Sequence, residues 1–108
     1  MRRGDIVTVA GGVCASKPRP ALVVQDDRFD ATDSVTVCLF TANEVDAPLL
    51  RVAVAADEVN GLGHDSYLMI DKITTVRRSN ARTVLGRLEA TTLVEVERRL
   101  LVFLGFGA

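Results

Sequence analysis

The segment of the chain best suited to chemistry is a short cationic loop stiffened by proline, residues 16–20, which reads SKPRP. A proline on each side of Arg19 restricts the backbone φ angle, so the guanidinium has little conformational entropy left to lose on binding. A guanidinium also donates two parallel hydrogen bonds, a geometry that suits a phosphate. The loop therefore indicates a phosphate site, and an ion pair between Arg19 and a nearby carboxylate, Asp26 or Asp27, is the structural alternative.

A second polar pair follows the clearest predicted strand. Thr41 ends that strand and Asn43 lies in the turn after it. A hydroxyl and an amide at a strand end often cap the turn, and the same groups are suited to hydrogen-bonding a phosphate oxygen. The residues alone leave both interpretations open.

The chain has few side chains for metal or acid–base chemistry. His64 is the only histidine, and the two cysteines, Cys14 and Cys38, lack metal-ligand spacing. A metal site would rest on carboxylates alone, and a pair of histidines acting as acid and base is impossible within one subunit. We therefore predict no metal and no cofactor, and we interpret His64 as a loop residue outside the chemistry.

The charges are unevenly distributed although the net charge is only −1. Residues 1–25 carry four basic and one acidic side chain, and residues 66–88 carry five and one. Residues 26–65 carry two basic and nine acidic side chains. Such blocks predict one cationic groove beside an acidic flank, with ordinary solvated surface as the alternative.

These residues must be positioned by short strands, which are bounded by turn residues over the first two-thirds of the chain. The predicted strands span residues 5–10, 21–25, 34–41, 51–54, 66–70, 73–76 and 84–88. We expect one domain over residues 1–108, built as a small, strongly bent sheet. Its exposed edges predict a homodimer. No apolar run is long enough for a membrane helix, and without a signal-like segment we expect a cytoplasmic protein.

The last segment changes to helical periodicity. Apolar residues recur at three- and four-residue spacing from Leu93 to Leu104, which predicts an amphipathic helix. Thr92 and Glu95 fit a capping box at its start, and Glu95 can pair with Arg99 one turn later. Gly105 suits the left-handed position that ends a helix.

The order and spacing of several short motifs resemble the MazF/PemK family of bacterial toxins over nearly the whole chain. The motifs are RGDIV at 3–7, RPALVVQ at 19–25, FTAN at 40–43, NGL at 60–62, DKITTV at 71–76 and LGRL at 85–88. The resemblance implies an SH3-like small barrel with a C-terminal helix, a homodimer, and an antitoxin partner similar to MazE.

The same resemblance implies a sequence-specific endoribonuclease that cleaves single-stranded RNA without metal. Arg19 and Thr41 match the family's central catalytic residues, and the RNA 2′-hydroxyl would attack the adjacent phosphorus to leave a cyclic phosphate and a 5′-hydroxyl. RNA contacts are expected from the residues flanking these two and from the second basic block: Ser16, Lys17, Asn43, Lys72, Arg77 and Arg78.

One departure from the family concerns the proton acceptor. Cys14 occupies the position where many members carry an acid–base Glu. Other members use an Asp and an Arg on a later strand; Asp71 matches that Asp, but Met69 replaces the Arg. Asp71 is therefore the predicted acid–base residue. The alternatives are a non-catalytic binding module and a gyrase-targeting toxin like CcdB, although CcdB toxins act through C-terminal residues that include a Trp, and this chain has none.

Overall fold

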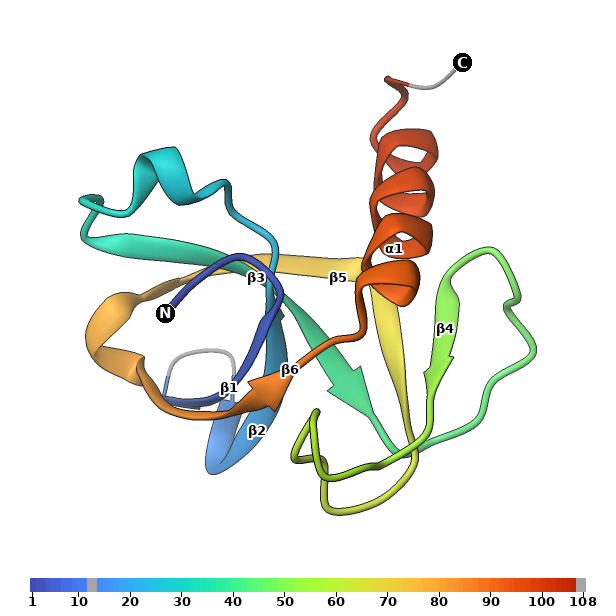
Figure 1. Ribbon diagram of the computed structural model, residues 1–108, viewed down its shortest axis with the longest axis horizontal. Coiled ribbons are helices and arrows are strands. Elements are labelled where there is room, and N and C mark those ends of the chain that lie inside the picture. The colour runs from blue at the N-terminus through green and yellow to red at the C-terminus, as the bar shows by residue number, and fades with distance from the viewer. Residues whose placement is uncertain (12–13, 107–108) are drawn as a thin grey trace.

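The computed structural model describes residues 1–11 and 14–106, with the side chains of residues 11–16 left out of the description. Six antiparallel strands form one sheet in the order β4-β5-β3-β2-β1-β6, and a single helix follows them (Figure 1). The elements are β1 (Asp5–Gly11), β2 (Cys14–Val23), β3 (Ser34–Thr41), β4 (Arg51–Val54), β5 (Ser66–Arg77), β6 (Ala81–Arg87) and α1 (Ala90–Phe103), with short 3-10 turns at Asp27–Phe29 and Arg78–Asn80. The predicted mainly β fold with a C-terminal helix is confirmed.

The bent sheet buries an apolar cluster on each of its faces, because successive strand residues point to opposite sides. Ile6 belongs to the cluster that packs under α1, to which the helix contributes Val96 and Leu100. Val7, its neighbour on β1, belongs to a second cluster that joins β1, β2 and β3 to the far end of β5. The curl of the sheet seen in Figure 1 encloses this second cluster.

Two predicted strands, residues 34–41 and 51–54, have the predicted bounds, but the segments 66–70 and 73–76 are wrong as separate strands. They form one long strand, β5, whose register against β3 shifts between Cys38, opposite Ile73, and Phe40, opposite Leu68. Residues 69–72 occupy this irregularity. The polar pair at 71–72, which separated the two predicted strands, therefore lies in a bulge of one continuous strand.

The SKPRP segment is also part of a strand and not a loop. β2 already begins at Cys14, and Arg19 pairs with Val9 of β1 while Pro20 pairs with Thr8. Prolines are tolerated there because each lacks only the N–H that one neighbouring strand would use. The guanidinium of Arg19 is therefore carried by a sheet strand, which fixes its position more firmly than a loop would.

The helix starts three residues earlier than the capping box predicted. Glu89 occupies the N-cap without a side-chain hydrogen bond, and Thr92 lies inside the first turn, so the predicted cap is wrong. The predicted end is confirmed: Gly105 adopts a φ of 85°. The amides of Gly105 and Phe106 bond the Val102 and Leu101 carbonyls, which completes the usual glycine-terminated helix end.

The predicted pair of Glu95 and Arg99 is confirmed, with Arg99 Nε 2.9 Å from Glu95 Oε1. In the described part of the chain, no helix is both long and apolar enough to cross a membrane.

Candidate active site

The candidate site opens where β2 and β3 separate. The two strands pair at Ala21 with Leu39, Leu22 with Cys38 and Val23 with Val37. The backbone pairing of β2 with β3 ends at Ala21, because Pro20 has no N–H to donate to β3. Extending the register by two residues places Arg19 opposite Thr41. We call this point, from Arg19–Ala21 on β2 to Leu39–Thr41 on β3, the β2/β3 fork.

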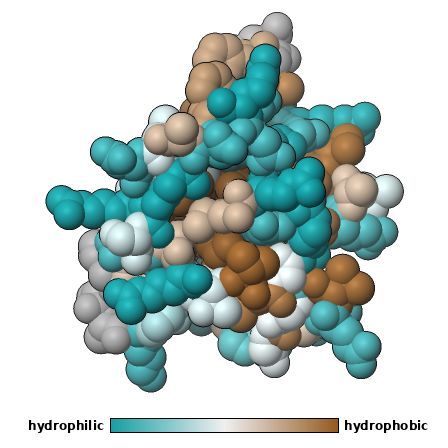
Figure 2. Space-filling view, turned by 60° about the vertical axis from the view of Figure 1, so that its left-hand side comes forward, coloured by the Kyte–Doolittle hydropathy of each residue, from teal (hydrophilic) through white to brown (hydrophobic). Residues whose placement is uncertain are grey.

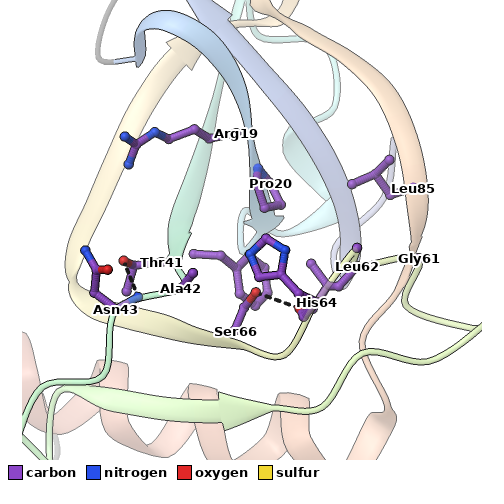
Figure 3. A pocket seen from close by; sticks show the side chains of 12 residues that line it. Arg19, Pro20, Thr41, Ala42, Asn43, Gly61, Leu62, His64, Ser66 and Leu85 are labelled. Carbon is purple, nitrogen blue, oxygen red and sulfur yellow. Dashed lines mark hydrogen bonds between the residues drawn. The ribbon is translucent and has the colours of Figure 1, made fainter.

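A pocket of about 560 Å³ occupies the fork and reaches across to the loop after β4. In Figure 3, Arg19 extends from β2 above Thr41 and Asn43, and His64 lies against the opposite wall. We call this the Arg19 pocket. Its lining residues are Arg19, Pro20, Phe40, Thr41, Ala42, Asn43, Gly61, Leu62, Gly63, His64, Ser66 and Leu85.

The hydroxyl of Thr41 is oriented by the turn that follows it. Its oxygen accepts a hydrogen bond from the backbone N–H of Asn43 at 3.2 Å. Because that lone pair is occupied by a donor, the hydroxyl hydrogen is available to donate to a bound group. The turn-capping and phosphate-binding interpretations of Thr41 are therefore compatible, since one atom can serve both.

The opposite wall of the pocket is a loop, residues 55–65, held together by the buried side chain of Asn60. The Asn60 amide oxygen accepts from the N–H groups of Asp57 at 3.1 Å and Leu62 at 3.0 Å. Its amide nitrogen donates to the Ala55 carbonyl at 2.8 Å. A short polar side chain thus replaces a regular strand as the support for this wall.

Two glycines, Gly61 in this loop and Gly86 on β6, allow the loop to lie directly against β6. A Cβ atom on Gly61 would lie 2.1 Å from the Leu85 carbonyl oxygen, and one on Gly86 would lie 2.1 Å from the Val59 carbonyl oxygen. Gly61 also has a φ of 70°, which side chains rarely adopt. The close approach fixes how far the loop stands from the β2/β3 fork.

His64 is positioned at the pocket by contacts of the two residues that follow it in the chain. Ser66 Oγ donates to the His64 carbonyl at 3.0 Å, and Asp65 Oδ1 accepts from the Ala56 N–H at 2.8 Å. In Figure 3 the imidazole lies over the pocket near Pro20. His64 is therefore a loop residue, as predicted, but one that lines the Arg19 pocket. Its being the only imidazole of the chain was the one available signal.

Asp71 is not brought to the pocket. Its carboxylate lies 2.6 Å from the guanidinium of Arg51, and neither residue lines the Arg19 pocket. Arg51 is the residue of β4 that pairs with Met69. Arg51, on the neighbouring strand, thus supplies the arginine that position 69 lacks. Asp71, the predicted acid–base residue, is held in an ion pair with it.

The second basic block is also away from the pocket. Arg77 pairs with Ser34, at the end of β3 opposite Thr41, and seven residues of strand span about 23 Å. Arg78 donates to the carbonyls of Phe29 and Thr32, so it holds the turn after β2. Lys72 is exposed on β5, outside the pocket lining. None of these three predicted RNA contacts lies at the β2/β3 fork.

Several arginines of the two basic blocks, which were predicted to form a cationic groove, form ion pairs with carboxylates instead. Arg3 pairs with Glu97 of α1 at 2.5 Å, and Arg87 pairs with Asp5 at 2.5 Å. Arg2 lies 3.8 Å from Asp27. These three arginines are therefore engaged by carboxylates, and Arg19 is the arginine of the basic blocks that lines the pocket.

The structural alternative for Arg19 is not observed. Asp26 pairs instead with Arg28 at 3.2 Å, and the Arg28 backbone N–H is the main cause that lowers the pKa of the Asp26 carboxyl. Asp27 accepts from the Arg3 N–H at 2.7 Å. Among the residues that the structure describes, no carboxylate forms an ion pair with Arg19, whose side chain is exposed.

The remaining predicted residues divide as follows. Asn43 lines the pocket beside Thr41, and Lys17 is exposed on β2, two residues before Arg19. The side chains of Ser16 and Cys14 lie outside the described residues.

Cys38 is buried, and desolvation raises the pKa of its thiol to about 12, so it is a core residue. Within the described ranges, no three His, Cys, Asp or Glu side chains cluster as metal ligands would.

The fold and the pocket define a small antiparallel β domain in which an exposed guanidinium and a hydroxyl line one pocket. Residues 2–104 match the family described as PemK-like, MazF-like toxins of type II toxin–antitoxin systems. The chain therefore belongs to the PemK/MazF toxin family, and the resemblance found in the sequence is confirmed.

Two curated relatives cover nearly the full chain. One is named a probable endoribonuclease MazF of Mycolicibacterium smegmatis. It is 56% identical over an alignment of 108 positions, which covers 99% of this chain and 99% of the relative. Another, the endoribonuclease MazF9 of Mycobacterium tuberculosis, is 30% identical over 93% of this chain and 92% of its own.

Solved structures confirm the fold. A mycobacterial endoribonuclease in complex with its cognate antitoxin superposes with a TM-score of 0.80 at 23% identity, over 97% of this chain and 95% of that one. A MazE–MazF complex from Deinococcus radiodurans gives 0.79 at 23% identity, over 98% and 97%. The Mycobacterium tuberculosis toxin MazF-mt6 gives 0.79 at 22% identity, over 94% and 96%.

Proposed function

We propose that this toxin is a sequence-specific, metal-independent endoribonuclease whose reaction takes place in the Arg19 pocket. The observation that carries the proposal is the convergence of Arg19 and Thr41 at the β2/β3 fork. The relative with 56% identity, named a probable endoribonuclease, supports the same activity.

The proposed reaction is attack of the RNA 2′-hydroxyl on the adjacent phosphorus. The bond from phosphorus to the 5′-oxygen breaks, and the products are a 2′,3′-cyclic phosphate and a 5′-hydroxyl. Negative charge builds on the non-bridging oxygens, where Arg19 neutralises it and the Thr41 hydroxyl donates a hydrogen bond. DNA lacks the attacking group, so the activity is confined to RNA.

The lining of the pocket supports a reaction in which side chains stabilise the anion directly. It offers a guanidinium, an oriented hydroxyl and the Asn43 amide, and none of the lining residues is a carboxylate. Carboxylates are the side chains through which Mg²⁺ is usually held beside a phosphate. We therefore expect cleavage to continue in excess EDTA.

The test is end-mapping of RNA incubated with the purified protein and EDTA. Cuts at one short motif, with cyclic-phosphate and 5′-hydroxyl ends, are the expected result. Activity that disappears with EDTA and returns with Mg²⁺ contradicts the metal independence. An RNA that stays intact under every condition contradicts the enzyme and leaves a binding module on the same fold.

The assembly we propose is a homodimer. The end of α1 exposes apolar side chains, among them Val102 at 66% and Phe106 at 78% exposure. Figure 2 shows hydrophobic surface at this end of the molecule, beside hydrophilic side chains. A chain of this size gains stability by burying such a patch against a second copy. Light scattering at micromolar concentration should give twice the monomer mass, and a monomer would contradict the proposal.

The regulatory partner we propose is a MazE-like antitoxin with a flexible acidic tail studded with apolar residues. The tail would cover Arg19, because an acidic peptide can occupy the place of the RNA phosphates. A segment that folds on binding can cover a long surface, and added salt should weaken the contact. Titration of the cognate antitoxin into the RNA assay should stop cleavage. Tight binding with unchanged cleavage would contradict occlusion of the pocket.

A further inference from the structure

The proposed reaction needs a proton at the leaving oxygen, and one lining residue of the Arg19 pocket is suited to supply it. Arginine stays protonated at all ordinary pH values, and the Thr41 and Ser66 hydroxyls are too weakly acidic to act as proton donors near neutral pH. Asn43 and the apolar lining residues do not titrate. An imidazole is the side chain that exchanges protons in this range, and the pocket has one, His64.

The position of His64 is determined by the fold. Ser66 Oγ holds its carbonyl at 3.0 Å, and the neighbouring Asp65 carboxylate is engaged with the Ala56 N–H at 2.8 Å. The loop behind it is fixed against β6 by the close approach of Gly61 to the Leu85 carbonyl. These contacts fix the backbone of His64 on the wall that faces the β2/β3 fork, and the imidazole lies over the pocket there (Figure 3).

The charged surroundings of His64 are simple. Arg19 of β2 is the charged residue that shares the pocket lining, and none of the lining residues is a carboxylate. Asp65, next to it in the chain, has its carboxylate turned to the Ala56 amide. The imidazole has no hydrogen bond to another described side chain, which leaves both ring nitrogens available to the substrate.

We propose that His64 is the general acid of the reaction, a role that rests on the proposed ribonuclease function. With Arg19 and Thr41 on the non-bridging oxygens, the protonated imidazole on the opposite wall donates its proton to the 5′-oxygen. The 2′-oxygen forms a bond to phosphorus, the bond to the 5′-oxygen breaks, and the 5′-hydroxyl leaves with the donated proton. The 2′-hydroxyl proton passes to water, and the imidazole is reprotonated from water.

The test compares two RNA substrates that carry the cleavage motif found by end-mapping. One has the natural 5′-oxygen at the cut and the other has a bridging 5′-sulfur, which leaves as a thiolate and needs no proton. We expect His64→Ala to slow single-turnover cleavage of the oxygen substrate on the order of a hundredfold or more. Cleavage of the sulfur substrate should remain close to that of the unaltered protein.

Two further variants control this comparison. Arg19→Ala should slow both substrates, because charge builds on the non-bridging oxygens in either case. Glu58→Gln, an exposed change in the same loop, should slow neither. His64→Asn keeps a polar side chain and is measured beside His64→Ala, with a thermal melt of each, so that an unfolded variant is recognised as such.

The outcomes separate the inference from the function on which it rests. If the unaltered protein cuts neither substrate, the proposed ribonuclease function fails. If it cuts both, and folded His64 variants either match it or slow both substrates equally, the function stands and the general-acid role of His64 is overturned. Selective rescue by the 5′-sulfur establishes the role.

Discussion

Two charged residues that the sequence placed in one active site have opposite surroundings in the structure. Arg19 is exposed at the β2/β3 fork, and within the described residues it has no ion-pair partner. Asp71 is held by Arg51 at 2.6 Å, in a pair whose side chains are 26% and 14% exposed. A partly buried charge is stabilised by its partner, whereas a charge that must bind a ligand is kept accessible.

The comparison shows why Asp71 is a poor proton acceptor for this reaction. Its carboxylate is engaged by the Arg51 guanidinium at 2.6 Å, and Asp71 is outside the pocket where Arg19 and Thr41 meet. The two regions therefore make different predictions for mutation. Changes at the β2/β3 fork should remove activity and spare stability, and changes at the Arg51–Asp71 pair should do the reverse.

The largest effect is expected for Arg19→Ala. It removes the guanidinium that stabilises the developing charge, and loss of one such donor costs on the order of a hundredfold to a thousandfold in rate. The side chain is exposed, so the unfolding midpoint should hardly change. Single-turnover RNA cleavage and a urea melt measure the two effects. Normal cleavage, or loss of cleavage only through unfolding, would show that the assignment is wrong.

A smaller loss is expected for Thr41→Val, which keeps the shape and removes the hydroxyl. A hydrogen bond to a charged group is worth about 1.5–3 kcal/mol, or roughly tenfold to a hundredfold in rate. The Asn43 N–H also loses its acceptor, but it is exposed to water. Thr41→Ser is the matched control, and it should retain most of the activity. A larger loss in Thr41→Ser than in Thr41→Val would point to packing by the methyl group instead.

Asp71→Asn should act on stability. It leaves the Arg51 guanidinium half-satisfied on a mostly buried side chain, which we expect to lower the free energy of unfolding by about 1–3 kcal/mol. Cleavage of RNA by the folded variant should remain within a few-fold of that of the unaltered protein. The double variant with Arg51→Met tests the pairing, since the two losses should not add. A large fall in cleavage with unchanged stability would return Asp71 to the active site.

The sequence predicted β3, which carries Thr41, and the two main residues of the site, but it took the part of β2 that carries Arg19 for a loop. Arg19 and Thr41 were found because local patterns identify them: prolines flank one, and the other ends a strand. His64 was missed because its position depends on the close approach of Gly61 and Gly86 to distant backbone. The partner of Asp71 was missed for a similar reason, since Arg51 lies on another strand. Neither contact leaves a local pattern in the chain.

The smallest effect concerns Cys38. Burial raises the pKa of this thiol to about 12, so the reactive thiolate is scarce at pH 8, and stability there should not depend on its ionisation. Iodoacetamide at pH 8 should leave the Cys38 peptide unmodified in the folded protein and modify it fully in urea. Mass spectrometry of that peptide distinguishes Cys38 from Cys14. Rapid modification in the folded state would contradict its place in the core.

One measurement tests the central claim, that RNA phosphate binds at the β2/β3 fork. A short oligonucleotide that carries the mapped motif with 2′-deoxyribose at the cut is not cleaved, and it can be titrated into isotope-labelled protein by NMR. We predict shifts for the Arg19 side-chain N–H and the amides of Thr41, Asn43 and His64, with Asp71 and Arg77 unchanged. Chemical-shift changes confined to Asp71 and Arg77, with no change at the residues of the Arg19 pocket, would contradict the account.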